Sequence, residues 1–273
     1  MDNSLILASH TCWLISARDA IAAPFVAQFA EVMRLRADGS SPREAHPLDL
    51  TTRHLFVVGD PCSAPVARNS DRTCVLRDVS CAEARFVALL DISLALVRAA
   101  QQNGAVLLHG ALAERAGLGV VLAGPGGIGK TSASNRLPPP WRSLCDDATL
   151  VVRDPTGVFW AHAWPTWSRF VSEDGRGGSW DVQHAVPLRA LFFLKQGSHD
   201  ASDSMDVKKA AALLVESAQQ AGLGMGRGLS AADKRALHLE RFETIYALAK
   251  AIPVFKLQLT RTGEFWSEIE MVI

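Results

Sequence analysis

The sequence has no excess of charge of either sign. Its 273 residues include 28 lysines and arginines and 28 aspartates and glutamates, so the formal net charge is zero. A protein without net charge exerts no general attraction on nucleic acid or on anionic lipid. We therefore expect no nucleic-acid partner and no membrane partner, and any phosphate group that binds must be held by a local arrangement of residues.

The cysteines form no Cys-x-x-Cys pair, and their number is odd. Disulfide frameworks and zinc sites use cysteines in even numbers or at short regular spacings. The pattern therefore favours reduced thiols in a cytosolic protein. The five cysteines are Cys12, Cys62, Cys74, Cys81 and Cys145.

Long hydrophobic runs are also lacking. The N-terminal residues, MDNSLILASHTCW, have no basic stretch leading into an apolar segment, so they do not resemble a secretion signal. The most apolar long segment, residues 84–100, is interrupted by Asp91 and carries Arg85 and Arg98 near its ends. It is too short and too charged to span a bilayer. A cytoplasmic protein is expected.

The chain nevertheless has enough apolar residues, 48%, to form a packed core. Apolar stretches predict strands, and apolar residues at helical spacing predict helices. Strands are expected at 4–8, 12–16, 54–58, 73–79, 105–108, 120–123, 188–194 and 254–259. Helices are expected at 22–35, 81–102, 207–220 and 231–251, loops at 36–48, 113–119 and 222–228, and either a strand or a short helix at 265–273. The fold class is α/β, with a mixed sheet of the α+β kind.

The length suits a catalytic domain of about 150 residues with a smaller appendage. We predict a small α+β N-terminal region over residues 1–100, to which no motif assigns a role. The catalytic domain is predicted over residues 101–273. A homo-oligomer is compatible with the sequence, which does not specify one.

One motif indicates a specific chemistry. Residues 124–131, GPGGIGKT, fit the P-loop pattern G-x-x-x-x-G-K-[ST] at every fixed position. A chain of this length matches that pattern by chance roughly once in a hundred sequences. An apolar strand precedes the loop, and the residues after it can open a helix that Pro138 must end near Leu137.

This loop predicts a site for ATP with Mg²⁺. Glycines let successive amides point at phosphate oxygens, Lys130 supplies a mobile cation, and the Thr131 hydroxyl can bind Mg²⁺. The alternative is a flexible glycine turn with an exposed lysine. The expected nucleotide contacts come from Gly124, Pro125, Gly126, Gly127, Ile128, Gly129, Lys130, Thr131 and Ser132.

Two further sets of residues bear on this site. Asp146 and Asp147 follow the loop, just before the apolar run at 148–152. Two adjacent carboxylates beside a metal can divide the work, one binding Mg²⁺ and the other accepting the proton of an attacking hydroxyl. In isolation such a pair is usually a polar turn. His109, at the end of the strand before the P-loop strand, is by itself usually a core or turn residue.

These motifs together resemble a known family. LLHG (107–110), GPGGIGKT (124–131) and LCDD (144–147) are similar to the C-terminal catalytic domain of HPr kinase/phosphorylase. Within that superfamily the chain is most similar to the shorter kinase-like proteins of peptide-modification gene clusters, including the SynChlorMet cassette type. LPPPWRSLCDDATLVV (137–152), HAWPTWS (162–168) and VPLRALFFL (186–194) support this.

The resemblance implies an HPr-kinase-like or PEP-carboxykinase-like P-loop fold and a kinase. Such an enzyme moves the γ-phosphoryl group of ATP to a serine or threonine hydroxyl of a peptide or small protein, here a ribosomally made precursor peptide. Asp146 would be the base and Asp147 the metal ligand, although the two roles could be reversed. Lys130 would act in catalysis, and His109 would belong to the phosphate site or a proton network.

The sequence also departs from the parent family. EDGRGG (173–178) only superficially resembles its glycine-rich signature, which leaves Glu173 as a metal candidate and puts phosphorylase activity and HPr as substrate in doubt. Arg227 could contact the transferring phosphate, or simply be a solvated loop residue. Two other functions stay open: a P-loop NTPase switch, and a small-molecule kinase. Labelled phosphate released only to water would indicate the switch.

Overall fold

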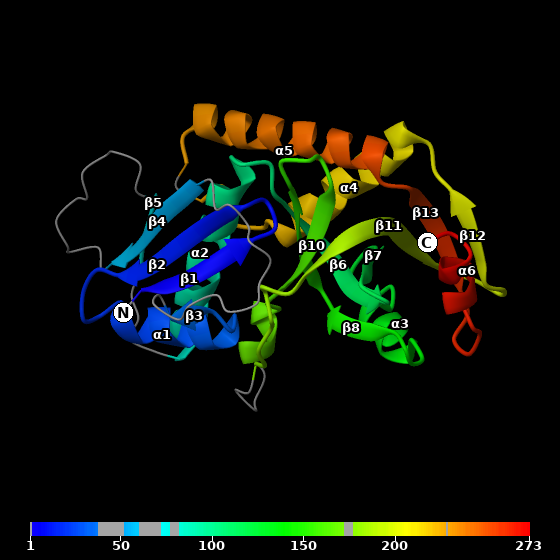
Figure 1. Ribbon diagram of the computed structural model, residues 1–273, viewed down its shortest axis with the longest axis horizontal. Helices are drawn as coiled ribbons and strands as arrows, with labels where there is room; N and C mark the ends of the chain where they lie inside the picture. Colours follow the sequence, from blue (N-terminus) through cyan, green and yellow to red (C-terminus); the bar gives the residue numbers. More distant parts are fainter. Residues whose placement is uncertain (1, 38–51, 60–71, 77–81, 172–176, 228) are drawn as a thin grey trace. The chain divides into compact units, whose positions relative to one another are not determined.

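The computed structural model describes residues 2–37, 52–59, 72–76, 82–171, 177–227 and 229–273. The chain divides into two compact units (Figure 1). The first contains Met1–Ala99 and Pro165–His184, and the second contains Ala100–Trp164 and Ala185–Ile273. Each unit has a mixed sheet of its own, so the chain has the mixed α and β composition predicted.

The first unit is built on a five-stranded sheet of order β3-β1-β2-β4-β5. Strand β1 pairs antiparallel with β2 and β3, whereas β2, β4 and β5 run parallel. The strands are β1 (Asn3–Leu7), β2 (Thr11–Ala17), β3 (Arg36–Ala37), β4 (Thr52–Gly59) and β5 (Arg72–Val75). The helices are α1 (Ala23–Val32), α2 (Ala82–Gln101), which ends in the second unit, and the 3₁₀ turn η1 (Trp167–Val171).

Helix α1 forms where the apolar spacing predicts it. Phe25, Phe29 and Val32 recur on one face, and all three are buried. Asp19 accepts a hydrogen bond from the Ala22 amide at the helix start. The loop predicted at 36–48 begins instead with the short strand β3, because its two residues pair with β1, and residues 38–48 lie outside the described part.

The second unit is built on an eight-stranded sheet of order β10-β9-β6-β7-β11-β13-β12, with β8 also paired to β6. Strand β10 pairs with β11 as well as with β9, so β10, β9, β6, β7 and β11 form a closed ring of pairings. The strands are β6 (Val106–Arg115), β7 (Leu118–Ala123), β8 (Arg142–Cys145), β9 (Ala148–Arg153), β10 (Phe159–Trp164), β11 (Ala185–Gln196), β12 (Ala201–Ser204) and β13 (Val254–Leu259). The helices are α3 (Lys130–Arg136), α4 (Val207–Ala221), α5 (Ala231–Ala251) and α6 (Trp266–Glu270).

One predicted segment in this unit has different bounds in the structure. The turn expected at 113–119 shrinks to Ala116 and Gly117, because both adopt positive φ and close a two-residue hairpin. Residues 113–115 therefore belong to β6, where Glu114 pairs with Gly119. The C-terminal segment forms the short helix α6. Helix α3 ends at Arg136, as the prolines after Leu137 predict.

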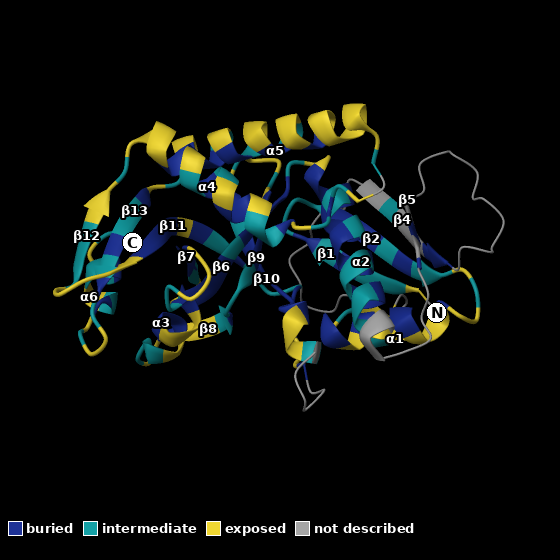
Figure 2. Cartoon of the chain, turned by 180° about the vertical axis from the view of Figure 1, so that it is seen from behind, coloured by how far each residue is buried: buried dark blue, intermediate teal, exposed yellow. Residues whose placement is uncertain are grey.

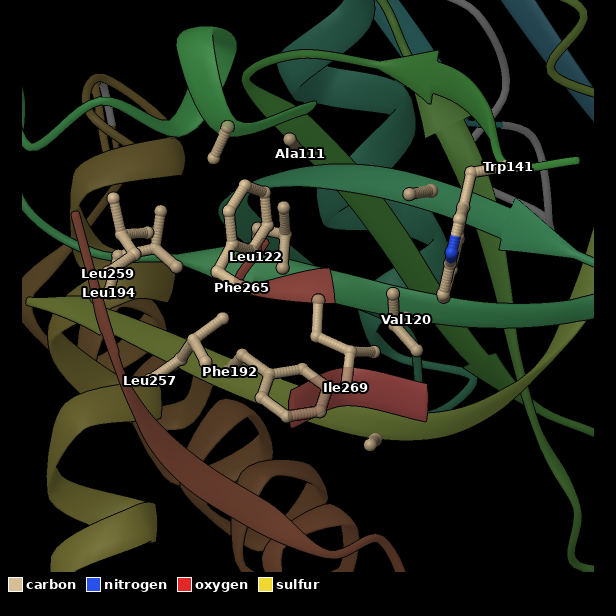
Figure 3. Packing of buried hydrophobic residues seen from close by; sticks show 13 residues of the cluster. Ala111, Val120, Leu122, Trp141, Phe192, Leu194, Leu257, Leu259, Phe265 and Ile269 are labelled. Atoms are coloured by element: carbon tan, nitrogen blue, oxygen red, sulfur yellow. The ribbon is translucent and has the colours of Figure 1, made fainter. Parts of the chain in front are cut away.

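A packed cluster of buried residues in this unit lies on one face of the sheet. Side chains alternate along a strand, and Val120, Leu122 and Phe192 point toward Phe265 and Ile269 at the C-terminus (Figure 3). Helix α4 packs against β6, and α5 packs against α4. Figure 2 shows that the strands carry mainly buried residues whereas α5 has a long exposed side.

Glu270 links the end of α6 to this cluster. Its Oε1 atom accepts a hydrogen bond of 2.8 Å from Trp141 Nε1 and lies 2.5 Å from the Arg115 guanidinium. The hydrogen bond from Trp141 is the main cause that holds the pKa of Glu270 below its ordinary value of 4.5. Arg115 lowers this pKa further, whereas burial of the carboxylate acts to raise it.

Glu270→Gln is therefore expected to lower the free energy of unfolding at neutral pH by about 1 kcal/mol, since the pair is partly exposed. A lowered carboxyl pKa stabilises the fold above the unfolded-state value and stops doing so as the pH falls through the folded-state value. The difference between wild type and variant should therefore shrink below pH 4.5. Denaturant unfolding measures it, with the exposed Glu264→Gln as control; an equal loss in both variants would contradict the role of Glu270.

Among the described residues, Cys12, Cys74 and Cys145 are buried and form no disulfide. Cys62 and Cys81 lie outside the described part of the chain. Within that part, each helix is too short or too polar to cross a bilayer.

Candidate functional site

A glycine-rich loop connects β7 to α3. Gly124, Gly127 and Gly129 have φ angles of 147°, 76° and 107°, which glycine adopts readily and other residues rarely do. No atom lies within 4 Å of where a Cβ would stand at Gly126, Gly127 or Gly129. These glycines therefore leave open space in front of the loop, with the N-terminus of α3 at its end.

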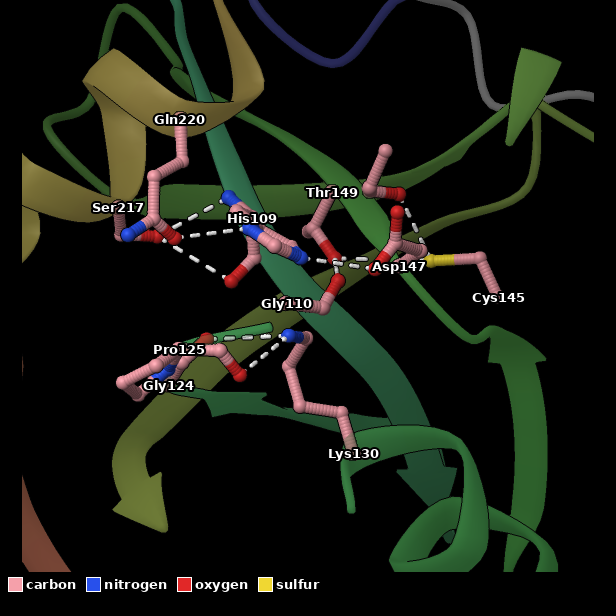
Figure 4. A network of polar contacts seen from close by, with 11 residues as sticks. His109, Gly110, Gly124, Pro125, Lys130, Cys145, Asp147, Thr149, Ser217 and Gln220 are labelled. Carbon is pink, nitrogen blue, oxygen red and sulfur yellow. Dashed lines mark hydrogen bonds and ion pairs between the residues drawn. The ribbon is translucent and has the colours of Figure 1, made fainter. Parts of the chain in front are cut away.

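Lys130 is the first residue of α3, and its side chain turns back along the loop. Its ammonium group donates hydrogen bonds of 3.0 Å to the Gly124 carbonyl and 3.2 Å to the Pro125 carbonyl (Figure 4). The residue is 5% exposed. Burial lowers the pKa of this ammonium below 10.5, while the nearby charges of Asp147 and Asp146 act in the opposite direction. The structure thus brings the lysine and both carboxylates into one electrostatic neighbourhood.

The two aspartates occupy the link between β8 and β9. The Asp147 carbonyl accepts a hydrogen bond of 2.9 Å from the Gly110 amide, and the hydroxyl of Thr149 donates one of 2.9 Å to the Gly110 carbonyl. These bonds fix the link beside β6. Both carboxylates are partly exposed, so a ligand can reach them while Lys130 interacts with them.

His109 connects the carboxylates to helix α4. Its Nε2 atom lies 2.9 Å from Asp147 Oδ1 and its Nδ1 atom 2.9 Å from Gln220 Oε1. Its backbone amide donates a hydrogen bond of 2.9 Å to the Ser217 hydroxyl. The same hydroxyl donates one of 3.3 Å to the His109 carbonyl. In Figure 4 the imidazole lies between Gln220 on one side and Asp147 on the other.

The placement of His109 differs from the prediction in one respect. It lies inside β6 and not at the end of a strand, because the strand continues through Gly110, which pairs with Ala123 of β7. His109 itself pairs with Ala148 of β9. A position within a strand fixes its backbone on both sides, which a loop position would not.

Ser217 and Gln220 are site residues that sequence reasoning missed. Ser217 is 4% exposed and shares a face of α4 with the buried Ala210 and Leu214. A hydroxyl on the apolar face of a helix is the one sequence signal that marks Ser217, since buried polar groups need a partner.

The cap of α4 fixes where this helix starts. The Asp206 side chain accepts hydrogen bonds from the amides of Lys208 and Lys209.

The other predicted residues are placed as follows. Thr131 and Ser132 are exposed on the first turn of α3, and the Ile128 amide donates to the Pro125 carbonyl within the loop. Arg227 is exposed in the loop after α4. It is not among the residues to which the side chains of His109 and Lys130 make the hydrogen bonds described above. Glu173 lies outside the described part of the chain.

The arrangement suits the binding of an anion and the transfer of a proton. A buried ammonium at the start of a helix attracts negative oxygen atoms. Two carboxylates beside it can accept a proton or bind a cation. The histidine positions one of the carboxylates, that of Asp147, through a hydrogen bond of 2.9 Å.

Comparison with known proteins identifies one family. The model of the family described as SynChlorMet cassette protein ScmC matches residues 73–273. The matched region contains the glycine-rich loop, His109, both aspartates and the two α4 residues. No curated protein matches the chain.

Proposed function

This chain belongs to the SynChlorMet cassette protein ScmC family, and from the site that its residues build we propose that it is a kinase. It transfers the γ-phosphoryl group of ATP to a hydroxyl group of a peptide or small protein. Membership of a cassette-associated family suggests a biosynthesis-related protein, which suits a ribosomally made precursor peptide as acceptor. One observation carries the proposal: the buried Lys130, at the end of a glycine-rich loop, interacts electrostatically with Asp146 and Asp147.

The loop fits a polyphosphate chain. Open space in front of Gly126, Gly127 and Gly129 lets phosphate oxygens approach the main chain. The first amides of a helix have no partner within the helix, and α3 begins directly at the end of the loop. We infer that residues 124–131 form a P-loop within an HPr-kinase-like or PEP-carboxykinase-like catalytic fold.

The same site suits Mg²⁺. The described residues include no group of three or more histidine, cysteine, aspartate or glutamate side chains that could hold a metal by itself. Mg²⁺ usually takes only one or two protein ligands and completes its shell with phosphate oxygens and waters. The exposed Thr131 hydroxyl and the Asp147 carboxylate would hold it. Bound Mg²⁺ would supply positive charge to neutralise the phosphates.

The remaining chemistry belongs to the side chains. The acceptor oxygen forms a bond to the γ-phosphorus as the bond to the bridging oxygen breaks, ADP leaves, and Asp146 takes the acceptor's proton. Lys130 stabilises the charge on the phosphates, and His109 holds the Asp147 carboxylate in place. This is catalysis by positioning and electrostatics.

Transfer of label tests the proposal. Purified protein is incubated with γ-labelled ATP, Mg²⁺ and serine- or threonine-containing peptides, including precursor peptides encoded beside its gene. The kinase proposal expects label on the peptide, located by mass spectrometry. Label released only as inorganic phosphate would contradict it and indicate an NTPase switch.

A pair of glycines provides a matched test of the loop. Gly127 and Gly117 have nearly the same φ, 76° and 79°, and neither has an atom within 4 Å of the place where a Cβ would stand. Alanine at either site should cost about 1 kcal/mol of stability from backbone strain alone. Only Gly127→Ala should also weaken Mg-ADP binding, by about tenfold or more, because its methyl group displaces a charge-assisted hydrogen bond.

Thermal unfolding and calorimetric titration of the two variants measure these effects. Gly117 lies in the hairpin between β6 and β7 and so serves as the control. Equal Mg-ADP affinity in both variants would contradict phosphate binding by the loop.

A further inference from the structure

A pocket opens beside the glycine-rich loop, and the transfer chemistry gives it no role. The empty space between its walls, with the open solvent at its mouth included, is about 270 Å³, and these walls are mostly apolar. Gly124 and Pro125 of the loop, Phe193 of β11 and Leu213 and Glu216 of α4 line it. Phe193 follows Phe192 of the packed cluster, so the pocket lies on the opposite face of the sheet, where α4 packs.

This pocket shares its walls with the site already described. Ser217 and Gln220 complete its lining, and the same two residues contact His109. On its other side, the carbonyls of Gly124 and Pro125 accept hydrogen bonds from the Lys130 ammonium. A group in the pocket therefore lies next to the residues that hold both the histidine and the lysine.

We propose that the pocket takes an aliphatic side chain of the acceptor peptide, adjacent to the serine or threonine that is phosphorylated. The inference rests on the proposed kinase function and adds to it the peptide sequence that the site selects. Burial of an aliphatic side chain against apolar walls is favourable. The walls offer few polar groups, so they suit an aliphatic chain better than a base or a sugar.

The negative charge of Glu216 at the pocket wall limits further which peptide side chains fit. Glu216 is exposed, and its carboxylate accepts a hydrogen bond from the Gln220 amide at 3.4 Å. A carboxylate at the wall disfavours an acidic side chain in the pocket and tolerates a basic residue outside it. The pocket thus selects leucine- or isoleucine-like neighbours and rejects aspartate or glutamate.

Peptide binding and peptide phosphorylation are measured side by side. The probes are synthetic fluorescent peptides with one serine and with leucine, alanine or aspartate at each position flanking it. Affinity is measured by fluorescence anisotropy, and kcat/KM by transfer from γ-labelled ATP. At one flanking position, the leucine peptide should exceed the alanine peptide by about tenfold or more in both measurements, and the aspartate peptide should be the poorest.

Two neighbouring residues of α4 give matched variants. Leu213→Trp fills the pocket and should remove the preference for leucine, whereas Ala212→Trp introduces the same side chain at an exposed position outside the pocket lining and should keep it. Leu213→Ala enlarges the pocket and should shift the preference from leucine toward phenylalanine. Thermal unfolding shows which variants are folded, and the enlarged pocket provides the test if the tryptophan variant is not.

The outcomes separate the pocket from the kinase function. The proposal about the pocket is overturned if the leucine and alanine peptides bind equally, or if the leucine preference survives in Leu213→Trp, even when label is transferred. A leucine preference in binding that Leu213→Trp removes supports the pocket even if no peptide receives label, and in that case the kinase proposal is the one that fails.

Discussion

Asp146→Asn is expected to slow phosphoryl transfer to a serine peptide by about 10²–10⁴-fold while Mg-ADP binds with unchanged affinity. Asparagine keeps the shape of the side chain but cannot accept the proton of the acceptor hydroxyl. The electrostatic interaction of the Asp146 carboxylate with Lys130 supports this role, because Lys130 belongs to the proposed phosphate site. Single-turnover transfer from γ-labelled ATP measures the rate, and calorimetry measures the affinity.

Two further aspartate variants make this result specific. Asp147→Asn should weaken Mg-ADP binding, because it removes the negative charge of the proposed metal ligand, which is also the partner of His109. Asp203→Asn makes the same chemical change at an exposed position on β12 and should alter neither quantity. If Asp147→Asn lost transfer with full affinity and Asp146→Asn lost affinity, the two roles would be reversed.

Lys130→Ala is expected to slow transfer by about 10²–10³-fold through the missing charge stabilisation, and to lower nucleotide affinity as well. The Gly124 and Pro125 carbonyls hold the ammonium group in place, and alanine supplies no cation there. Its pKa is lowered mainly by burial, which means that the fold keeps this cation at some cost. A phosphate ligand would offset that cost by supplying the opposite charge.

The matched control is Lys208→Ala, which removes an exposed lysine near the start of α4. It should leave transfer and Mg-ADP affinity within about twofold of wild type, since exposed charges interact weakly through water. Thermal unfolding of both variants excludes a general loss of structure. Wild-type Mg-ADP affinity in Lys130→Ala would mean that the loop does not bind phosphate.

Sequence reasoning performed best where the signal is local. The glycines of residues 124–131 require backbone angles that few other residues adopt, and three of them have positive φ. The prolines after Leu137 remove amide donors, so an end of α3 near Leu137 could be predicted, and the helix ends at Arg136. Of the thirteen strands among the described residues, eight were predicted from their apolar spacing, although β6 runs seven residues past its predicted end, and β3, β8, β9, β10 and β12 were not predicted.

The parts that could not be predicted depend on contacts between distant segments. Gln220 reaches His109 across 111 positions of the chain, and nothing in the spacing of α4 says which strand it will cover. The same holds for the pocket, whose walls come from the glycine-rich loop, β11 and α4. Pairing also decides that His109 lies within a strand. The domain boundary predicted at residue 100 and the nucleotide contacts stay predictions.

The closed ring of strand pairings restrains the strands that carry the site. A strand at the margin of an open sheet can fray by releasing the single neighbour that holds it. Near Ala161, β10 is bonded to Val151 of β9 and to Val186 of β11, so it cannot detach there without breaking two ladders together. His109 on β6 and Asp147 just before β9 are attached to this ring. Thermal fluctuations that loosen surface loops should therefore leave the spacing of these two residues intact.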